Sequence, residues 1–178
     1  MTIPIRLMIV AALMSAFLVA MIADHHIRRS TGTDVILDLE PVDPRDLLAG
    51  YYVIISTPVH RIQYDSVEGD RDFSAHDDVF VSIEPESDGS WSPVSIHRTR
   101  PANGVYLHGK VQTASTDGIT AHFNIERFYA DETTAQALDQ RRFSDRDSMR
   151  LIVSVGNDGR AIIRGLEIEG ERQIAPLL

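Results

Sequence analysis

An uncharged apolar run near the N-terminus, residues 7–23, constrains this chain more than any other feature of its sequence. The run is apolar on all sides of a helix, whereas a helix packed on a soluble core is apolar along one stripe. At a rise of about 1.5 Å per residue the run is roughly 25 Å long, the short end of a bilayer span. It therefore predicts one transmembrane helix, in a membrane anchor of residues 1–29 followed by a separate domain over residues 30–178.

A cleaved signal peptide, which would leave a soluble secreted domain, is the alternative interpretation of this run. Signal peptides have a shorter apolar region and a small residue at each of two positions before the cut. A cut after Ala23 would place Met21 at the second of these positions, so the uncleaved anchor is favoured. Arg6 and the terminal amine nearly balance Arg28 and Arg29 across the run. Because the N-terminal flank is short, we expect the C-terminal domain on the non-cytoplasmic side.

The composition excludes several classes of function. A formal net charge of −9 argues against a nucleic-acid partner, because nothing concentrates cations to neutralise phosphates. The chain has no cysteine, which removes disulfides, thiolate zinc sites and thiol nucleophiles together.

Beyond the anchor, short β-like segments alternate with turn sequences about every ten residues, which is typical of an antiparallel β domain. Predicted strands cover residues 34–40, 51–57, 79–84, 91–98, 105–111, 119–125, 149–155 and 161–168. Asn157-Asp158-Gly159 gives the strongest hairpin signal. The polar composition of residues 60–75 predicts an exposed loop, and the pattern of residues 131–142 predicts one short helix. The predicted fold class is mainly β, an antiparallel β-rich domain with one short helix, preceded by a single N-terminal transmembrane helix.

The segment of residues 41–53 is the densest group of conformationally specific residues in the chain. Asp43 suits a helix N-cap and Pro44 the first helical position, so a short helical turn is expected here. Gly50 follows seven residues after Asp43 and lets the backbone bend where other residues resist. Residues 51–57 are β-branched and aromatic with little alternation, which predicts a central strand.

These segments, taken in order, resemble the GDYXXLXY protein family of bacterial proteins, which have an N-terminal membrane helix and an extracytoplasmic domain of unknown function. The matching blocks are residues 32–37, 41–47, 50–53, 91–111, 125–129 and 158–166. The name-giving Gly-Asp-Tyr of the family reads Gly50-Tyr51-Tyr52 here, and Ala49 replaces an arginine often found before the glycine. Any contact made by that acidic residue and that arginine is therefore expected to be lost or altered in this chain.

The resemblance implies a membrane-anchored binding or accessory module in the bacterial inner membrane, working with a multi-pass membrane protein. It implies no cofactor, and an enzymatic activity is the less favoured expectation. The bilayer itself is the other expected partner, through residues 7–23. The candidate motif and binding residues are Asp43, Pro44, Arg45, Asp46, Gly50, Tyr52, Lys110, Glu126 and Arg127.

Most of these candidates have a structural interpretation beside the functional one. For Glu126 and Arg127, a partly buried ion pair holding the helix against the sheet is favoured over contact with a ligand. For Arg45, the favoured role is a turn-stabilising network in which Asp43 caps the turn and Arg45 bridges to a neighbouring strand.

The alternative function is an envelope hydrolase that uses the sheet face near Tyr52 and Lys110. Lys110 could deprotonate Ser56 or Ser95 if burial lowered its pKa, although no nucleophile-elbow sequence supports this. The ordinary expectation is that Lys110 pairs with one of the 26 carboxylates.

Two histidine-containing clusters raise the question of a metal. They are His25-His26 beside the apolar run and His76-Asp77-Asp78 at a strand start. Neither has the paired helical spacing of a zinc motif, so we predict solvated residues and no metal site.

Overall fold

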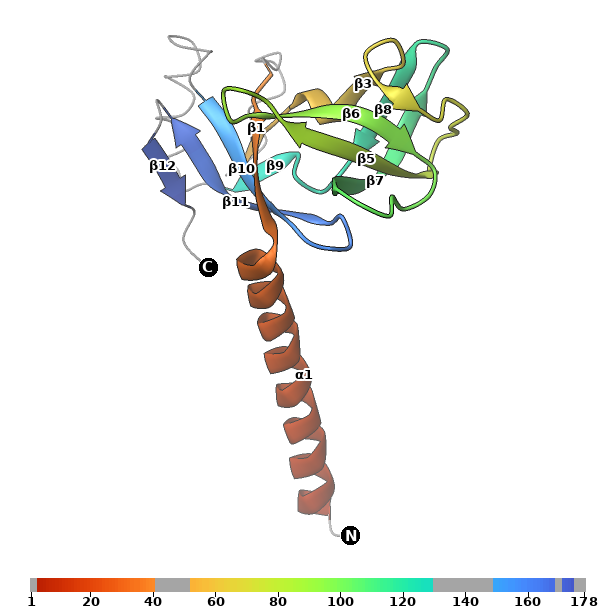
Figure 1. Ribbon diagram of the computed structural model, residues 1–178. Coiled ribbons are helices and arrows are strands. Elements are labelled where there is room, and N and C mark those ends of the chain that lie inside the picture. Colours follow the sequence, from red (N-terminus) through yellow and green to blue (C-terminus); the bar gives the residue numbers. More distant parts are fainter. Residues whose placement is uncertain (1–2, 41–51, 130–148, 169–170, 175–178) are drawn as a thin grey trace.

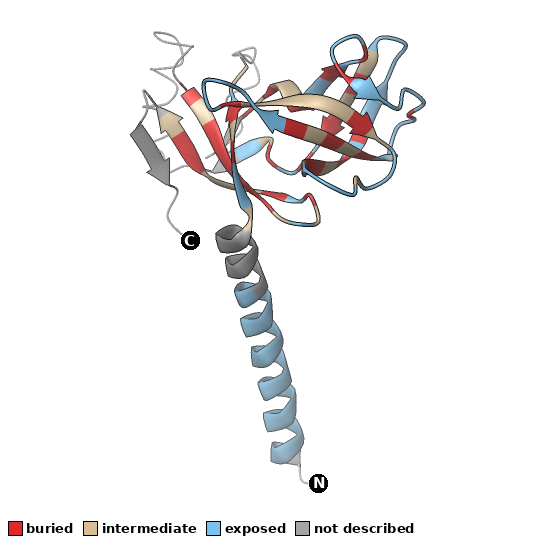
Figure 2. Cartoon of the chain, viewed as in Figure 1, coloured by how far each residue is buried: buried red, intermediate tan, exposed pale blue. Residues whose placement is uncertain are grey.

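The computed structural model describes residues 3–40, 52–129, 149–168 and 171–174, and consists of a long N-terminal helix joined to a β domain (Figure 1). Helix α1 spans Ile3–Thr31. Its segment Pro4–Ala23 has a mean hydropathy of 2.4 and is nowhere buried (Figure 2). The helix predicted from the apolar run is confirmed, and it is long and apolar enough to cross a membrane.

The β domain contains a four-stranded antiparallel sheet of order β1-β10-β11-β12. Its strands are β1 (Thr33–Asp38), β10 (Met149–Val155), β11 (Ala161–Ile168) and β12 (Glu171–Ile174). Strands β10 and β11 form the hairpin predicted around residues 157–159, whereas β12 has no counterpart among the predicted strands.

A six-stranded sheet of order β3-β8-β7-β5-β6-β4 makes up the other large part of the domain. Its strands are β3 (Arg61–Gln63), β4 (Glu68–Gly69), β5 (Asp78–Pro85), β6 (Trp91–His97), β7 (Val105–Ala114) and β8 (Gly118–His122). The β4–β6 pair is parallel and the other pairs are antiparallel. Within the described residues β2 (Tyr52–Ile54) and β9 (Arg127–Tyr129) form a separate antiparallel pair. The prediction of a mainly β domain is confirmed.

Both large sheets contribute to one hydrophobic core (Figure 2). Alternation within the strands decides which side chains enter it, because successive residues of a strand face opposite sides of the sheet. Fully buried core side chains include Val35, Leu37, Leu151 and Val153 from the four-stranded sheet and Val79, Val81, Ile96 and Leu107 from the six-stranded one.

Helix α1 passes into β1 with Gly32 as the only intervening residue. A Cβ atom at Gly32 would overlap the Ser154 hydroxyl and lie 2.9 Å from the Val155 carbonyl oxygen, so this close approach requires glycine. Strand β1 then pairs with β10 along its whole length, from Thr33 opposite Val155 onward. The helix is therefore attached directly to a strand whose side chains Val35 and Leu37 lie in the core.

The prediction of a central strand over residues 51–57 is wrong. Strand β2 has three residues and pairs with β9, and beyond it Ser56 forms one isolated bridge, with Glu40. Ile55 donates its N–H to the Glu126 carbonyl, and a 3₁₀ turn begins at Pro58. A continuous apolar run signals burial, which Ile55 and Thr57 do show, but it does not set the number of neighbouring strands.

The prediction of an exposed loop over residues 60–75 is also wrong. This stretch contains β3 and β4 and places four large side chains in the core: Ile62, Tyr64, Val67 and Phe73. The apolar residues are isolated among polar ones, so composition hid the period-two spacing that begins with Ile62 and Tyr64. The predicted helix of residues 131–142 lies outside the described residues.

Candidate functional site

The predicted site residues divide between two sheets. Tyr52 and Arg127 lie in the β2–β9 pair, and Glu126 precedes β9. Lys110 lies in β7 of the six-stranded sheet. Tyr52 and Lys110 therefore do not share the single sheet face assumed for a hydrolase. The candidates Asp43, Pro44, Arg45, Asp46 and Gly50 all lie outside the described residues.

Glu126 is the centre of a half-buried polar cluster. Its Oε1 atom lies 3.3 Å from His60 Nε2 and 3.3 Å from His122 Nδ1. The same oxygen accepts a hydrogen bond from the backbone N–H of Phe123. Burial alone would raise the pKa of Glu126, but the His60 ring at 3.3 Å and the hydrogen bond from the Phe123 N–H outweigh it and lower the pKa to about 2. The carboxylate is therefore charged across the ordinary pH range.

The proton on His60 is fixed by its other ring nitrogen. The backbone N–H of Thr57 donates to His60 Nδ1 at 3.0 Å, so Nδ1 holds a lone pair. A neutral imidazole then carries its proton on Nε2, which faces Glu126. A metal ion at Nε2 would need the opposite tautomer and would break the Thr57 bond. The Nε2 proton of His60 thus points toward the Glu126 carboxylate and not toward a metal site. The described residues include no group of three side chains suited to a metal.

The Glu126 cluster ties two separate parts of the chain together, the 3₁₀ turn that ends at His60 and the segment from His122 to Glu126. Its carboxylate closes the turn between β8 and β9, in which Asn124 has a left-handed φ of 62°. The His60 ring, at the end of the 3₁₀ turn, packs edge-on against Phe123 with ring centres 5.9 Å apart. The expected structural role of Glu126 thus involves His60 and His122 as partners, which sequence reasoning missed because neither spacing carries a local signal. Arg127 is exposed.

Lys110 forms an ion pair with the carboxylate of Asp78. Its Nζ lies 3.0 Å from Asp78 Oδ1, and His108 Nε2 lies 2.9 Å from the same oxygen. Hydrogen bonds from His108 and Lys110 lower the pKa of Asp78 below its usual value. The side chain of Lys110 is 61% exposed, so burial does not prepare it as a base.

The serines considered as nucleophiles have other partners. Ser56 donates to Glu40 at 3.2 Å, and Ser95 lies 2.9 Å from His97 Nε2. The Ser95–His97 contact joins residues two apart on one strand, and no carboxylate of the described residues orients His97. A catalytic triad is therefore not assembled by the described part of the chain.

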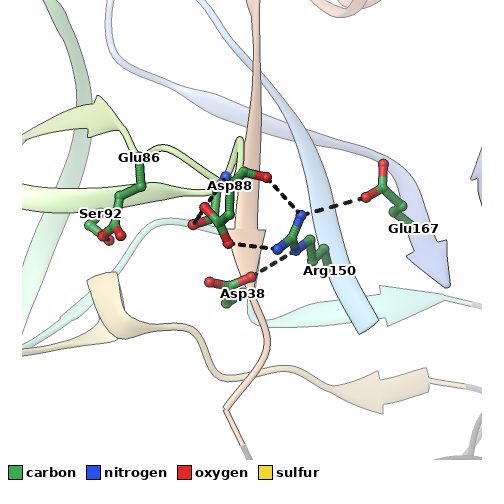
Figure 3. Close-up of polar contacts among 7 residues, drawn as sticks. Asp38, Glu86, Asp88, Ser92, Arg150 and Glu167 are labelled. Atoms are coloured by element: carbon green, nitrogen blue, oxygen red, sulfur yellow. Dashed lines mark hydrogen bonds and ion pairs between the residues drawn. The ribbon is translucent and has the colours of Figure 1, made fainter. Parts of the chain in front are cut away.

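Arg150 connects the two large sheets (Figure 3). From β10, its Nε donates to Asp38 of β1 at 3.0 Å, and its NH2 donates to Asp88 at 2.7 Å. Asp88 lies in the turn between β5 and β6, where it also accepts two hydrogen bonds from Ser90. Glu167 of β11 lies 3.9 Å from the same guanidinium. Nothing in the sequence signalled this cluster, because its members are far apart in the chain. Asp38 lies 50 residues before Asp88 (88 − 38), and Arg150 lies 62 residues after it.

A second connection between the sheets lies at the end of the domain nearest α1. The β10–β11 turn rests on β7 and the loop before it, where Tyr106 Oη of β7 and Arg100 NH2 of the β6–β7 loop each donate to the Asn157 carbonyl at 2.8 Å. Gly159, with a φ of 78°, sits so close to the Tyr106 ring that any side chain would overlap it. Beside this contact lies a cavity of about 350 Å³.

The structure thus defines a β-domain protein with an N-terminal helix capable of crossing a membrane. The chain belongs to the GDYXXLXY protein family, whose family model matches residues 14–166. The match begins within α1 and ends in β11, and it confirms the resemblance seen in the sequence. No curated protein and no solved structure matches the chain.

Proposed function

We propose that this protein is a single-pass, membrane-anchored binding or accessory module of the bacterial inner membrane, with its β domain outside the cytoplasm and a multi-pass membrane protein as its partner. The observation that carries the proposal is the exposed apolar helix α1 joined to the domain through Gly32 alone. The family resemblance supplies the expectation of a multi-pass partner.

The junction supports an accessory role because helix and domain present one continuous surface to a neighbour. A flexible linker would let the domain search the surrounding space, whereas one residue between helix and strand restrains its height and direction. A partner embedded in the bilayer could therefore contact α1 and the domain at the same time. In α1, large side chains such as Leu13, Phe17 and Met21 are more than half exposed and available for packing in the membrane.

The side of the membrane can be tested by labelling, because the chain has no cysteine of its own. We suggest two single-cysteine variants, Ala75→Cys at an exposed turn of the domain and Thr2→Cys at the other end of α1. A membrane-impermeant maleimide should label Ala75→Cys in intact spheroplasts and Thr2→Cys only after lysis. The reverse pattern would place the domain in the cytoplasm and refute this part of the proposal.

The partner can be tested by crosslinking the full chain in native membranes before purification. A multi-pass membrane protein should be recovered reproducibly, and Arg127→Ala should reduce its recovery severalfold. Arg61→Ala is the matched control, since Arg61 is another exposed arginine, on β3 at the edge of the other sheet. Failure to recover any membrane protein, with the chain itself intact in the membrane, would remove the partner from the proposal.

A further inference from the structure

The cavity beside the Asn157 contact has an unusual lining for so acidic a chain. Eleven residues line it: Thr33, Arg100, Pro101, Ala102, Asn103, Gly104, Val105, Tyr106, Val155, Gly156 and Asn157. None is acidic and one is an arginine, although the chain has a net charge of −9. A concave site of this kind favours a small anion over a cation.

Arg100 has donor capacity left for such an anion. One guanidinium nitrogen donates to the Asn157 carbonyl, and the group lies 5.7 Å from the centre of the Tyr106 ring. These contacts hold the guanidinium in place without neutralising it, because no carboxylate of the described residues pairs with Arg100. By contrast, Arg98, Arg150 and Arg164 each pair with aspartate.

The loop between β6 and β7 also lines this cavity, and it carries backbone donors. The backbone N–H groups of Ala102, Asn103 and Gly104 have no hydrogen-bond partner within the described part of the chain. Consecutive free N–H groups in a turn, together with a guanidinium, are the usual elements of a phosphate site in proteins.

The cavity faces the membrane end of the domain. Thr33, which lines it, is two residues beyond the end of α1, and the β10–β11 turn projects to the same end (Figure 1). From Ser15, the middle of the apolar run, α1 geometry places Thr33 about 27 Å from the bilayer centre, or about 25 Å at an average tilt. Headgroups extend to about 20–22 Å from the centre, and a long arginine side chain can bridge the difference.

From these observations we propose that the cavity of residues 100–106 and 155–157 binds the phosphate of an anionic phospholipid headgroup. Arg100 supplies the charge, and the N–H groups of the β6–β7 loop supply the neutral hydrogen bonds. The site depends on α1 lying in the bilayer, but not on the side of the membrane or on any protein partner.

The experiment uses the isotopically labelled full chain in zwitterionic micelles and follows the amide NMR signal of Gly104. Both lipids carry the phosphodiester, but the choline cation of dihexanoyl phosphatidylcholine is repelled by Arg100 and finds no carboxylate in the cavity lining. Dihexanoyl phosphatidylglycerol should therefore shift this signal at about tenfold lower concentration than dihexanoyl phosphatidylcholine. Arg100→Gln should remove the difference between the lipids, Arg100→Lys should restore part of it, and the distant control Arg61→Gln should leave it unchanged.

Three outcomes would overturn the proposal. The two lipids could act equally on the wild-type chain, or Arg100→Gln and Arg61→Gln could behave alike. Alternatively, inorganic phosphate could displace phosphatidylglycerol at equal concentration, which would make the cavity a site for free phosphate. Unchanged amide signals of the core strands in Arg100→Gln would show that the variant is folded. Because no protein partner is present, failure here would be independent of failure in the crosslinking experiment.

Discussion

Glu126 and Asp78 are two carboxylates with similar partners and different surroundings. Each is paired with histidine, and the basic side chains lie closer to Asp78, at 2.9 and 3.0 Å, than the two histidines lie to Glu126, at 3.3 Å; Glu126 in addition accepts a short hydrogen bond from the Phe123 N–H. The side chain of Glu126 is 20% exposed and that of Asp78 is 48% exposed. The difference teaches that burial, rather than contact length, decides which carboxylate stabilises the fold, because water competes for the partners of the exposed one.

The largest expected effect comes from removing the buried carboxylate. Glu126→Ala should lower the free energy of unfolding by about 3 kcal/mol, because it leaves a histidine N–H and a backbone N–H buried without an acceptor. Urea unfolding of the full chain in detergent micelles measures this change. A loss no larger than that of Asp78→Asn in the same micelles would show that burial is not the deciding difference.

The pH dependence of unfolding should show the next largest effect. The folded pKa of Glu126, about 2, is below its ordinary value of 4.5, so the unfolded chain binds a proton first. The stabilisation is fully present above about pH 4.5 and is lost as the pH falls toward 2. Allowing for solvent screening, it amounts to roughly 2 kcal/mol. Urea titrations at pH 6 and pH 3 should show this loss in wild type and a smaller one in Glu126→Gln; equal losses would contradict the assignment.

Arg150 offers an intermediate case, since its side chain is 27% exposed and its guanidinium binds Asp38 of β1 and Asp88 of the β5–β6 turn. Arg150→Met keeps the apolar stem and removes the charge, and should lower the free energy of unfolding by about 1 kcal/mol. The control is Arg160→Met, whose side chain is 69% exposed and lies 3.9 Å from Asp158. Indistinguishable unfolding curves for the two variants would show that the Arg150 guanidinium does not stabilise the contact between the two large sheets.

The smallest effect is expected at the exposed carboxylate. Asp78→Asn should change the free energy of unfolding by less than about 0.5 kcal/mol, and 1 M salt should remove most of that change. The same urea experiment, at low and high salt, measures it. A salt-independent loss above about 1 kcal/mol would mean that Asp78 is as well shielded as Glu126.

Features that depend on residues close together in the chain could be predicted from this sequence. The apolar run gave α1, and Asn157-Asp158-Gly159 gave the β10–β11 hairpin, because both depend on local hydrophobicity or turn chemistry. Helix α1 ends at Thr31, two residues beyond the predicted anchor.

Features that depend on distant parts of the chain could not be predicted. Glu126 was singled out, but its partner His60 is 66 residues away (126 − 60) and carries no signal of that contact. The same holds for Arg150 and Asp88, and for the pairing of β2 with β9. Period-two spacing was present at Ile62 and Tyr64, yet polar neighbours concealed it.

Because Gly32 is the only residue between α1 and β1, the length of α1 determines which way the domain faces around the helix axis. One residue added to α1 between Ala23 and Thr31 would turn every following atom by about 100° around the helix axis and raise it by about 1.5 Å. Four added residues would exceed a full turn by about 40° and bring the domain back close to its original heading, about 6 Å higher. A series of one to four alanine insertions would therefore rotate the face that the domain turns toward its neighbours without altering a residue of the domain itself.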